Sequence, residues 1–134
     1  MPKPMNVVFV CHHGAARSVI AAELLRRLAD ERGQLVRSSA FGLEPDAEIP
    51  PHVVAGLRSD GVDISDRRPE GLTEDAFIGA DQVVAMGCDV TSSVPVVQWD
   101  DIPAVSDGYD AARTAIVARL EQLLLSLQSA AAKN

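Results

Sequence analysis

Cysteine is scarce in this chain, which carries only Cys11 and Cys88 among its 134 residues. Two cysteines cannot build the disulfide framework of a small secreted protein. The first five residues also contain no apolar core of secretory length, and strand-like residues follow directly. We therefore expect the protein to act in the reducing cytoplasm, where both thiols stay free for chemistry.

Positive charge and long apolar runs are lacking as well. The 12 lysines and arginines are outnumbered by 19 aspartates and glutamates, which gives a formal net charge of -7. This surplus excludes nucleic acid and anionic membrane surfaces as general partners, so any anion must be bound by local geometry. No segment approaches the roughly 20 apolar residues of a membrane span.

The chain does have enough hydrophobic residues for a sizeable core, 47% of the sequence, arranged in alternating strand and helix patterns. This alternation predicts one α/β domain, residues 1–134, with a parallel sheet flanked by helices. The predicted strands are 6–10, 35–40, 82–86 and 94–97. The predicted helices are 18–32, 50–60, a short one capped by Thr73, and a long one that begins near Tyr109.

Weaker patterns complete this outline. Residues 35–40 are less apolar than the other strands, which favours a position near the sheet edge. Residues 41–49 and 99–107 are expected to form loops, and residues 129–134 a frayed tail. Cys11, Phe41, Cys88 and Trp99 each follow a predicted strand, so we expect them to share one rim of the sheet.

The stretch from Cys11 to Ser18 is the strongest functional signal. A buried strand ends on Cys11, small residues follow, and Arg17 and Ser18 open a helix. Such a turn directs successive N–H groups into one concavity, and the helix N-terminus adds partial positive charge. We expect a Cys11 thiolate within an oxyanion-binding loop, a bidentate contact from Arg17, and a hydrogen bond from Ser18. The loop comprises His12, His13, Gly14, Ala15, Ala16 and Arg17.

This stretch resembles the phosphate-binding loop of the low-molecular-weight protein tyrosine phosphatase superfamily, and it is most similar to the branch of thiol-linked arsenate reductases. Further segments follow in family order: Ala21-Ala22-Glu23, Ser39-Ala40-Phe41-Gly42-Leu43-Glu44-Pro45, Gly61-Val62-Asp63-Ile64-Ser65 and Val83-Val84-Ala85-Met86-Gly87-Cys88. The resemblance covers nearly the whole chain. It implies a four-stranded parallel sheet, no bound cofactor, and a cysteine that attacks the central atom of an oxyanion.

The loop departs from the family pattern at two places. Family loops usually carry asparagine where this chain has Gly14, and glycine accepts the same left-handed backbone. His12 and His13 are unusual together, and we expect them to face solvent or pack the loop rather than catalyse. We expect no metal site, because the side chains of Cys11, His12 and His13 diverge and no further ligand cluster follows.

Cys88 has two readings. It is either a small core residue, or a resolving thiol that attacks a Cys11–arsenic adduct and releases arsenite as a disulfide forms. It matches the first cysteine of the reductases' redox segment. Ser92 or Ser93 stands near the place of the second, so a relay of three cysteines within one chain is excluded. A reductase would therefore use an external thiol to complete its cycle.

A phosphatase also needs a proton donor for the leaving oxygen, and relatives take it from an Asp-Pro pair after the fourth strand. Residues 99–107 contain no such pair. One alignment puts Ala104 at the place of the acid, and others nominate Asp100, Asp101 or Asp107. We choose Asp101. Trp99 and Tyr109 are the aromatic residues available to grip a phenyl ring.

Three functions remain open. The first is thiol-dependent reduction of arsenate to arsenite, with a small-molecule thiol or a thiol redox protein as partner. The second is hydrolysis of phosphomonoesters through a cysteinyl-phosphate, as in a low-molecular-weight protein tyrosine phosphatase. The third is a degenerate module that binds an oxyanion or a phosphoprotein without turnover.

Overall fold

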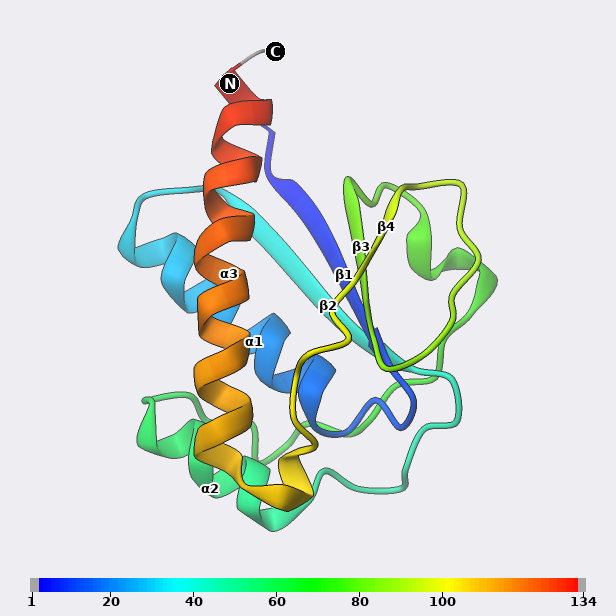
Figure 1. Ribbon diagram of the computed structural model, residues 1–134, viewed down its shortest axis with the longest axis vertical. Helices are drawn as coiled ribbons and strands as arrows, with labels where there is room; N and C mark the ends of the chain where they lie inside the picture. Colours follow the sequence, from blue (N-terminus) through cyan, green and yellow to red (C-terminus); the bar gives the residue numbers. More distant parts are fainter. Residues whose placement is uncertain (1–2, 133–134) are drawn as a thin grey trace.

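The computed structural model describes residues 3–132 and contains a parallel sheet of four strands in the order β2-β1-β3-β4 (Figure 1). The predicted α/β fold with a parallel sheet is therefore confirmed, and so is the edge position of β2. Strand β1, which lies between β2 and β3, consists mostly of apolar residues, as is typical of a strand that is covered on both faces. The strands are β1 (Met5–Cys11), β2 (Val36–Gly42), β3 (Gln82–Met86) and β4 (Val96–Gln98).

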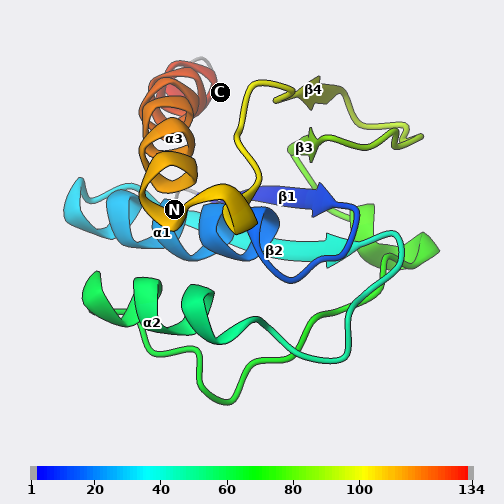
Figure 2. The same cartoon turned by 60° about the horizontal axis from the view of Figure 1, so that its bottom comes forward.

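Three α-helices pack on one face of the sheet through a common hydrophobic cluster (Figure 2). They are α1 (Arg17–Glu31), α2 (Pro51–Ser59) and α3 (Tyr109–Ala132). The opposite face holds a smaller cluster, which is covered by the 3-10 helix η1 (Glu74–Phe77) and by loops. A second 3-10 helix, η2 (Val105–Asp107), precedes α3.

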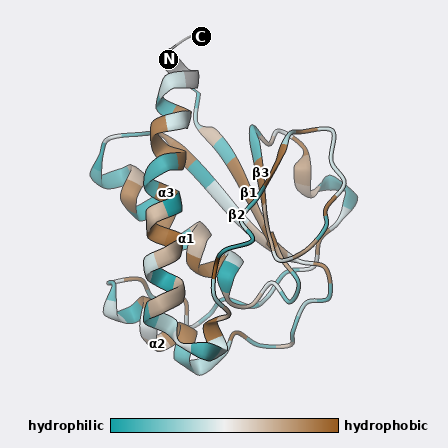
Figure 3. Cartoon of the chain, in the orientation of Figure 1, coloured by the Kyte–Doolittle hydropathy of each residue, from teal (hydrophilic) through white to brown (hydrophobic). Residues whose placement is uncertain are grey.

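Side-chain alternation along β1 explains this division. Val7, Phe9 and Cys11 belong to the cluster under the helices, whereas Val8 and Val10 belong to the opposite cluster. Apolar residues colour much of β1 and β3 and alternate with polar ones along α3 (Figure 3). The strand that ends on Cys11 is thus held from both sides.

Several expected boundaries are wrong. The short helix after Thr73 is the 3-10 helix η1, and the Thr73 side chain makes no capping hydrogen bond. Gly42 belongs to β2 rather than to a loop, and η2 interrupts the predicted loop 99–107. The expected frayed tail is helical through Ala132, while residues 133–134 lie outside the described part. Within residues 3–132, no helix combines the length and apolar character that a membrane crossing requires.

Two leucines on α3 test how much of the stability comes from packing between the helices and the sheet. Leu120 is fully buried and Leu125 is 62% exposed. Leu120→Ala should lower the free energy of unfolding by about 2–5 kcal/mol, because it leaves a cavity in the core. Leu125→Ala should change it by less than about 0.5 kcal/mol. Urea unfolding followed by circular dichroism measures both, and equal losses would contradict the assigned packing.

Candidate active site

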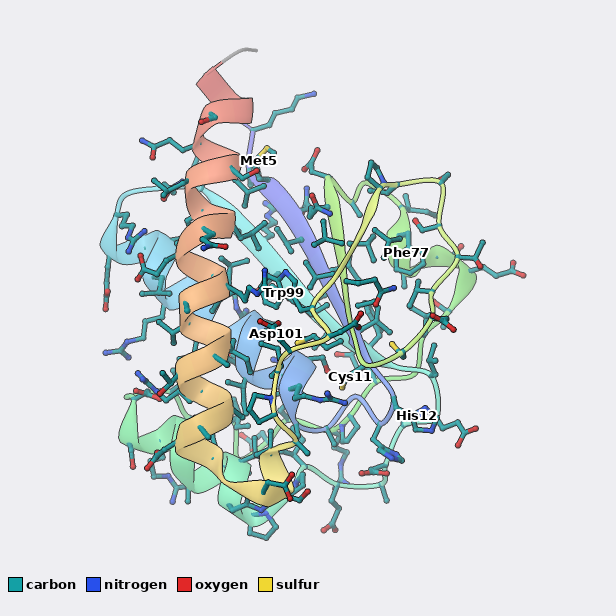
Figure 4. The ribbon with its side chains drawn as sticks, in the orientation of Figure 1. Met5, Cys11, His12, Phe77, Trp99 and Asp101 are labelled. Carbon is teal, nitrogen blue, oxygen red and sulfur yellow. The ribbon has the colours of Figure 1, made fainter. Side chains whose placement is uncertain are left out.

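Cys11 lies at the carboxyl end of β1, opposite Gly42 of β2 and Met86 of β3 in the sheet register (Figure 4). Phe41 lies at the end of β2, Cys88 follows β3 by two residues, and Trp99 directly follows β4. The predicted shared rim is confirmed. The rim matters because α1 begins six residues after Cys11 and turns its N-terminus toward the same place.

Ser18 contacts the sulfur of Cys11 directly. Ser18 Oγ lies 3.0 Å from Cys11 Sγ, within hydrogen-bond distance. Cys11 is 4% exposed, and Ser18 is fully buried, the single polar residue of the described chain in the buried class. A hydroxyl in this position donates to a thiolate without competition from bulk water. In the structure the Cys11 thiol donates to Ser18 Oγ, and the same hydroxyl is placed to donate to the sulfur once the thiol has lost its proton.

The backbone of the loop is oriented by the segment that follows β2. The carbonyls of Cys11, His12 and His13 accept hydrogen bonds from the N–H groups of residues 43, 44 and 46, at 3.3, 2.9 and 3.1 Å. Within the described chain, the N–H groups of residues 12–16 donate to no backbone carbonyl. Ala16 also supplies no side-chain cap for α1. These donors remain available for an oxyanion.

The turn requires glycine at two facing positions. Gly14 has a φ of +63°, which side chains rarely accept. A Cβ atom on Gly14 would lie 2.6 Å from the backbone nitrogen of Gly42, and one on Gly42 would lie 2.5 Å from the nitrogen of Gly14. The left-handed backbone expected at Gly14 is present. The two glycines let the loop lie directly on the end of β2.

Arg17 is held against backbone rather than against a carboxylate. Its Nη1 lies 3.5 Å from the carbonyl oxygen of Ile102. A Cβ on Gly87 would lie 3.0 Å from both terminal nitrogens of the guanidinium, so Gly87 makes room for it. None of the ion pairs found within residues 3–132 includes Arg17. The guanidinium can therefore offer its donors to a bound anion.

The two adjacent histidines pair with carboxylates from the segment after β2. His12 Nε2 lies 3.4 Å from Glu44 Oε2, and His13 Nδ1 lies 3.1 Å from Asp46 Oδ1. The imidazole rings meet edge to face, with centroids 4.5 Å apart. Both side chains are partly exposed. Within the described residues, no group of three or more His, Cys, Asp or Glu side chains could hold a metal ion.

A pocket of about 190 Å³ opens over the loop. Its walls come from the segment after β2, from the start of α2 and from η2, and no Phe, Tyr or Trp of the described chain lines it. Trp99 is buried against Phe9 at a ring distance of 5.7 Å, and the ring of Tyr109 lies over Gly56. The lining residues are Cys11, His12, His13, Ala15, Ala16, Arg17, Asp46, Pro50, His52, Ala104, Val105 and Ser106.

The choice of Asp101 as the proton donor is wrong, because Asp101 does not line this pocket. Its Oδ2 accepts a hydrogen bond of 2.8 Å from Arg119 on α3, and its side chain is 61% exposed (Figure 4). That hydrogen bond holds the pKa of Asp101 below its usual value. A carboxyl that is ionised at neutral pH and tied to an arginine is a poor proton donor. Ala104 lines the pocket instead.

Cys88 lies near the site but belongs to the other face of the sheet. Its thiol packs with the cluster around Val8 and Val10, and its Sγ lies 3.6 Å from the carbonyl oxygen of Val10. Burial raises the pKa of the Cys88 thiol, and the negative charge of Cys11 raises it further. Both cysteines are free. Cys88 is therefore a protonated, weakly nucleophilic thiol at neutral pH.

Asp46 and His52 line the pocket and Glu44 lies beside His12 outside it, and none of the three was predicted from the sequence. A signal for Glu44 and Asp46 was present, because acidic residues follow β2 while histidines follow the neighbouring strand β1. Parallel neighbours end at the same rim, so the two segments had to meet. His52 is the second residue of α2, and nothing local to the chain indicates that this helix begins at the pocket.

Comparisons with known proteins agree with this geometry. The sequence model of the family described as low molecular weight phosphotyrosine protein phosphatase matches residues 6–106. Among solved structures, a thioredoxin-dependent arsenate reductase from Corynebacterium glutamicum is 31% identical, with a TM-score of 0.79. That alignment covers 97% of this chain and 65% of the reductase, so the chain spans less than two thirds of its relative.

Two further structures share the fold. A low molecular weight protein tyrosine phosphatase from T. tengcongensis is 23% identical, with a TM-score of 0.77 and coverage of 91% of this chain and 99% of that chain. An arginine phosphatase from Geobacillus stearothermophilus is 19% identical, with a TM-score of 0.72 and coverage of 98% and 97%. No curated protein sequence matches the chain.

Gly14 and Gly33 form a matched pair for testing the contact between the loop and β2. Both have a left-handed backbone, with φ of +63° and +66°, but a Cβ on Gly33 would meet nothing within 4 Å. Gly33→Ala should cost about 1–2 kcal/mol of folding free energy from backbone strain alone. Gly14→Ala should cost more and weaken phosphate binding at least about tenfold, because the loop must lift from β2. Urea unfolding and calorimetric titration with phosphate measure the two effects.

The raised pKa of Cys88 predicts its alkylation behaviour. In a Cys11→Ser variant, labelling of Cys88 by iodoacetamide should be slow at pH 7 and accelerate about tenfold per pH unit toward and beyond pH 9, because only the thiolate reacts. Mass spectrometry of quenched samples gives the rates. A rate that levels off below pH 8 would contradict the burial argument.

Proposed function

The chain belongs to the family of low molecular weight phosphotyrosine protein phosphatases, and within this family we propose that it reduces arsenate to arsenite with thiols as the electron source. The observation that carries the choice is the pocket wall. The pocket holds the loop of Cys11 and Arg17, but it includes no aspartate from the segment after β4 and no Phe, Tyr or Trp ring. Such a wall suits a small tetrahedral oxyanion better than an aryl phosphate.

In the first step, the Cys11 thiolate attacks arsenic. Ser18 stabilises the thiolate before the attack, through the contact of 3.0 Å between Oγ and Sγ. The free N–H groups of the loop and the guanidinium of Arg17 bind the arsenate oxygens and the negative charge that develops on them. A sulfur–arsenic bond forms, one arsenic–oxygen bond breaks, and the departing hydroxide takes up a proton and leaves as water.

In the second step, a thiol attacks the sulfur of Cys11. The electron pair of the sulfur–arsenic bond passes to arsenic, which leaves as arsenite, and a disulfide forms. A second thiol then reduces this disulfide and restores Cys11. We assign both thiols to an external small-molecule thiol or a thiol redox protein in the reducing cytoplasm, because Cys88 is protonated and packs on the opposite face. The similarity to a thioredoxin-dependent reductase supports this source of electrons.

Hydrolysis of phosphomonoesters is the second candidate, favoured by the family itself and by the same nucleophilic loop. An aryl phosphate needs a proton donor beside its leaving oxygen, and Asp101 is unsuited to this role. Binding of an oxyanion or a phosphoprotein without turnover is the third candidate. All three candidate functions use Cys11 and Arg17 to hold the anion. Only the substrate that the protein consumes can therefore distinguish them.

Arsenite production tests the proposal. The wild-type protein with arsenate and either glutathione or a thioredoxin system should form arsenite, measured by arsenic speciation. Cys11→Ser should reduce the rate at least about 10³-fold, since the nucleophile is lost. Asp101→Asn should retain at least half of the rate, because Asp101 pairs with Arg119 outside the pocket.

Other outcomes identify the alternatives. Hydrolysis of p-nitrophenyl phosphate that survives Cys88→Ser, without thiol-dependent arsenite, would establish the phosphatase. Tight binding of vanadate or arsenate with no consumption of any substrate would establish the binding module. Thiol-dependent turnover that Cys88→Ser abolishes would keep the reductase and make Cys88 the resolving thiol.

A further inference from the structure

The pair formed by His13 and Asp46 is a feature of the pocket that the reaction above does not use. Their side chains come from the ends of the neighbouring strands β1 and β2 and meet at 3.1 Å between His13 Nδ1 and Asp46 Oδ1. The backbone repeats the contact, because the N–H of Asp46 donates to the carbonyl of His13 at 3.1 Å. Both residues line the same pocket as Cys11 and Arg17. One backbone hydrogen bond and one side-chain contact thus join His13 to Asp46 beside Cys11 and Arg17.

The reaction needs a proton at this place. When sulfur attacks, the oxygen opposite Cys11 leaves, and hydroxide is a poor leaving group unless it is protonated. The loop N–H groups and Arg17 bind charge but do not give up protons. Asp101 is ionised and tied to Arg119. The remaining proton donors of the lining are His12, His13, Asp46, His52 and Ser106.

His13 is the imidazole of this set whose carboxylate partner also lines the pocket. Its Nδ1 lies 3.1 Å from Asp46 Oδ1, and Nε2 is the ring nitrogen left without a carboxylate neighbour among the described residues. His12 uses Nε2 itself toward Glu44, and Glu44 does not line the pocket. His52 pairs with no carboxylate among the described residues 3–132. The His13 side chain is 59% exposed, which places it at the pocket mouth and lets solvent return the proton.

We propose that His13, held by Asp46, protonates the oxygen that leaves arsenate when Cys11 attacks. The step balances: the thiolate and HAsO₄²⁻ form a sulfur–arsenic bond, one arsenic–oxygen bond breaks, and His13 gives its proton to the departing hydroxide. The products are the Cys11–arsenic adduct, water and neutral His13. Asp46 acts as a positioning residue. This assignment rests on the proposed reduction of arsenate. The other charged or titratable groups around the pair are Cys11, His12, Arg17, Glu44 and His52.

The test compares His13→Asn, Asp46→Asn and the matched control Glu44→Gln, which alters the neighbouring carboxylate partner of His12. With thiol saturating, kcat/KM for arsenate reports the attack. His13→Asn should lower it by about 10²–10⁴-fold and remove the alkaline fall in rate that a general acid gives the wild-type protein. Asp46→Asn should lower it by about 10–100-fold, and Glu44→Gln by less than threefold. The inhibition constant of phosphate should stay within threefold in all variants, which also shows that the pocket is folded.

Several results would overturn the assignment. One is a His13→Asn variant that keeps kcat/KM within threefold or keeps the alkaline fall. Another is an equal loss of kcat/KM in Glu44→Gln and Asp46→Asn, which would show that both histidine–carboxylate pairs only support the packing of the loop. A loss in phosphate affinity that matches the loss in rate would make His13 a binding residue.

A measurement on the wild-type protein with vanadate separates this inference from the proposed function. Nitrogen chemical shifts of the His13 ring should show both nitrogens protonated in the vanadate complex, and Asp46→Asn should lose this signature. If arsenate is not reduced but the signature is present, the proposed function fails and the His13 assignment stands. If arsenate is reduced and the signature is absent, the assignment fails alone.

Discussion

The contact between the nucleophilic loop and the end of β2 is the constraint on which the site depends. Gly14 and Gly42 approach so closely that a Cβ on either would meet the other's backbone within 3 Å. This approach lets the segment after β2 take the carbonyls of Cys11, His12 and His13 as acceptors. Because those carbonyls point outward to their partners, the loop N–H groups are left to face the anion. The orientation of the loop N–H groups therefore depends on strand packing as much as on the sequence of the loop.

The same contact explains how a protein with a net charge of -7 can bind an anion. The acidic residues nearest the site, Glu44 and Asp46, each lie beside a histidine of the loop. Arg17 has no carboxylate partner within residues 3–132, and the N-terminus of α1 has no side-chain cap. The carboxylates of Glu44 and Asp46 thus lie against imidazole rings, while the Arg17 guanidinium has no carboxylate partner among the described residues. Within the pocket, the local arrangement of charged groups therefore matters more than the net charge of the whole chain, because salt screens the distant charges.

The parts of the site that the sequence predicts are those in which neighbours in the chain are neighbours in space. Cys11, the turn, Arg17 and Ser18 are contiguous, and parallel strands end at one rim, so these features could be anticipated. The partners of Asp101 and Cys88 could not. Arg119 reaches Asp101 from α3, and the face occupied by Cys88 depends on the turn at Gly87, which has a φ of +69°. Such contacts are decided by tertiary packing, which no local pattern encodes.

The position of a proton donor also bears on the size of the substrate. A donor on the segment after β4 stands across the pocket from the loop and leaves room between them for the organic part of an ester. His13 is part of the loop itself and lines the pocket together with Cys11 and Arg17, so a proton from it serves a leaving group that stays close to the loop. The wall opposite it, at Ala104 and Val105, carries neither an acid nor an aromatic ring. A proton donor on the loop, as proposed for His13, and a pocket wall without an aromatic ring both favour water as the leaving group. The proposed reduction of arsenate and the proposed role of His13 thus support each other through the shape of the pocket.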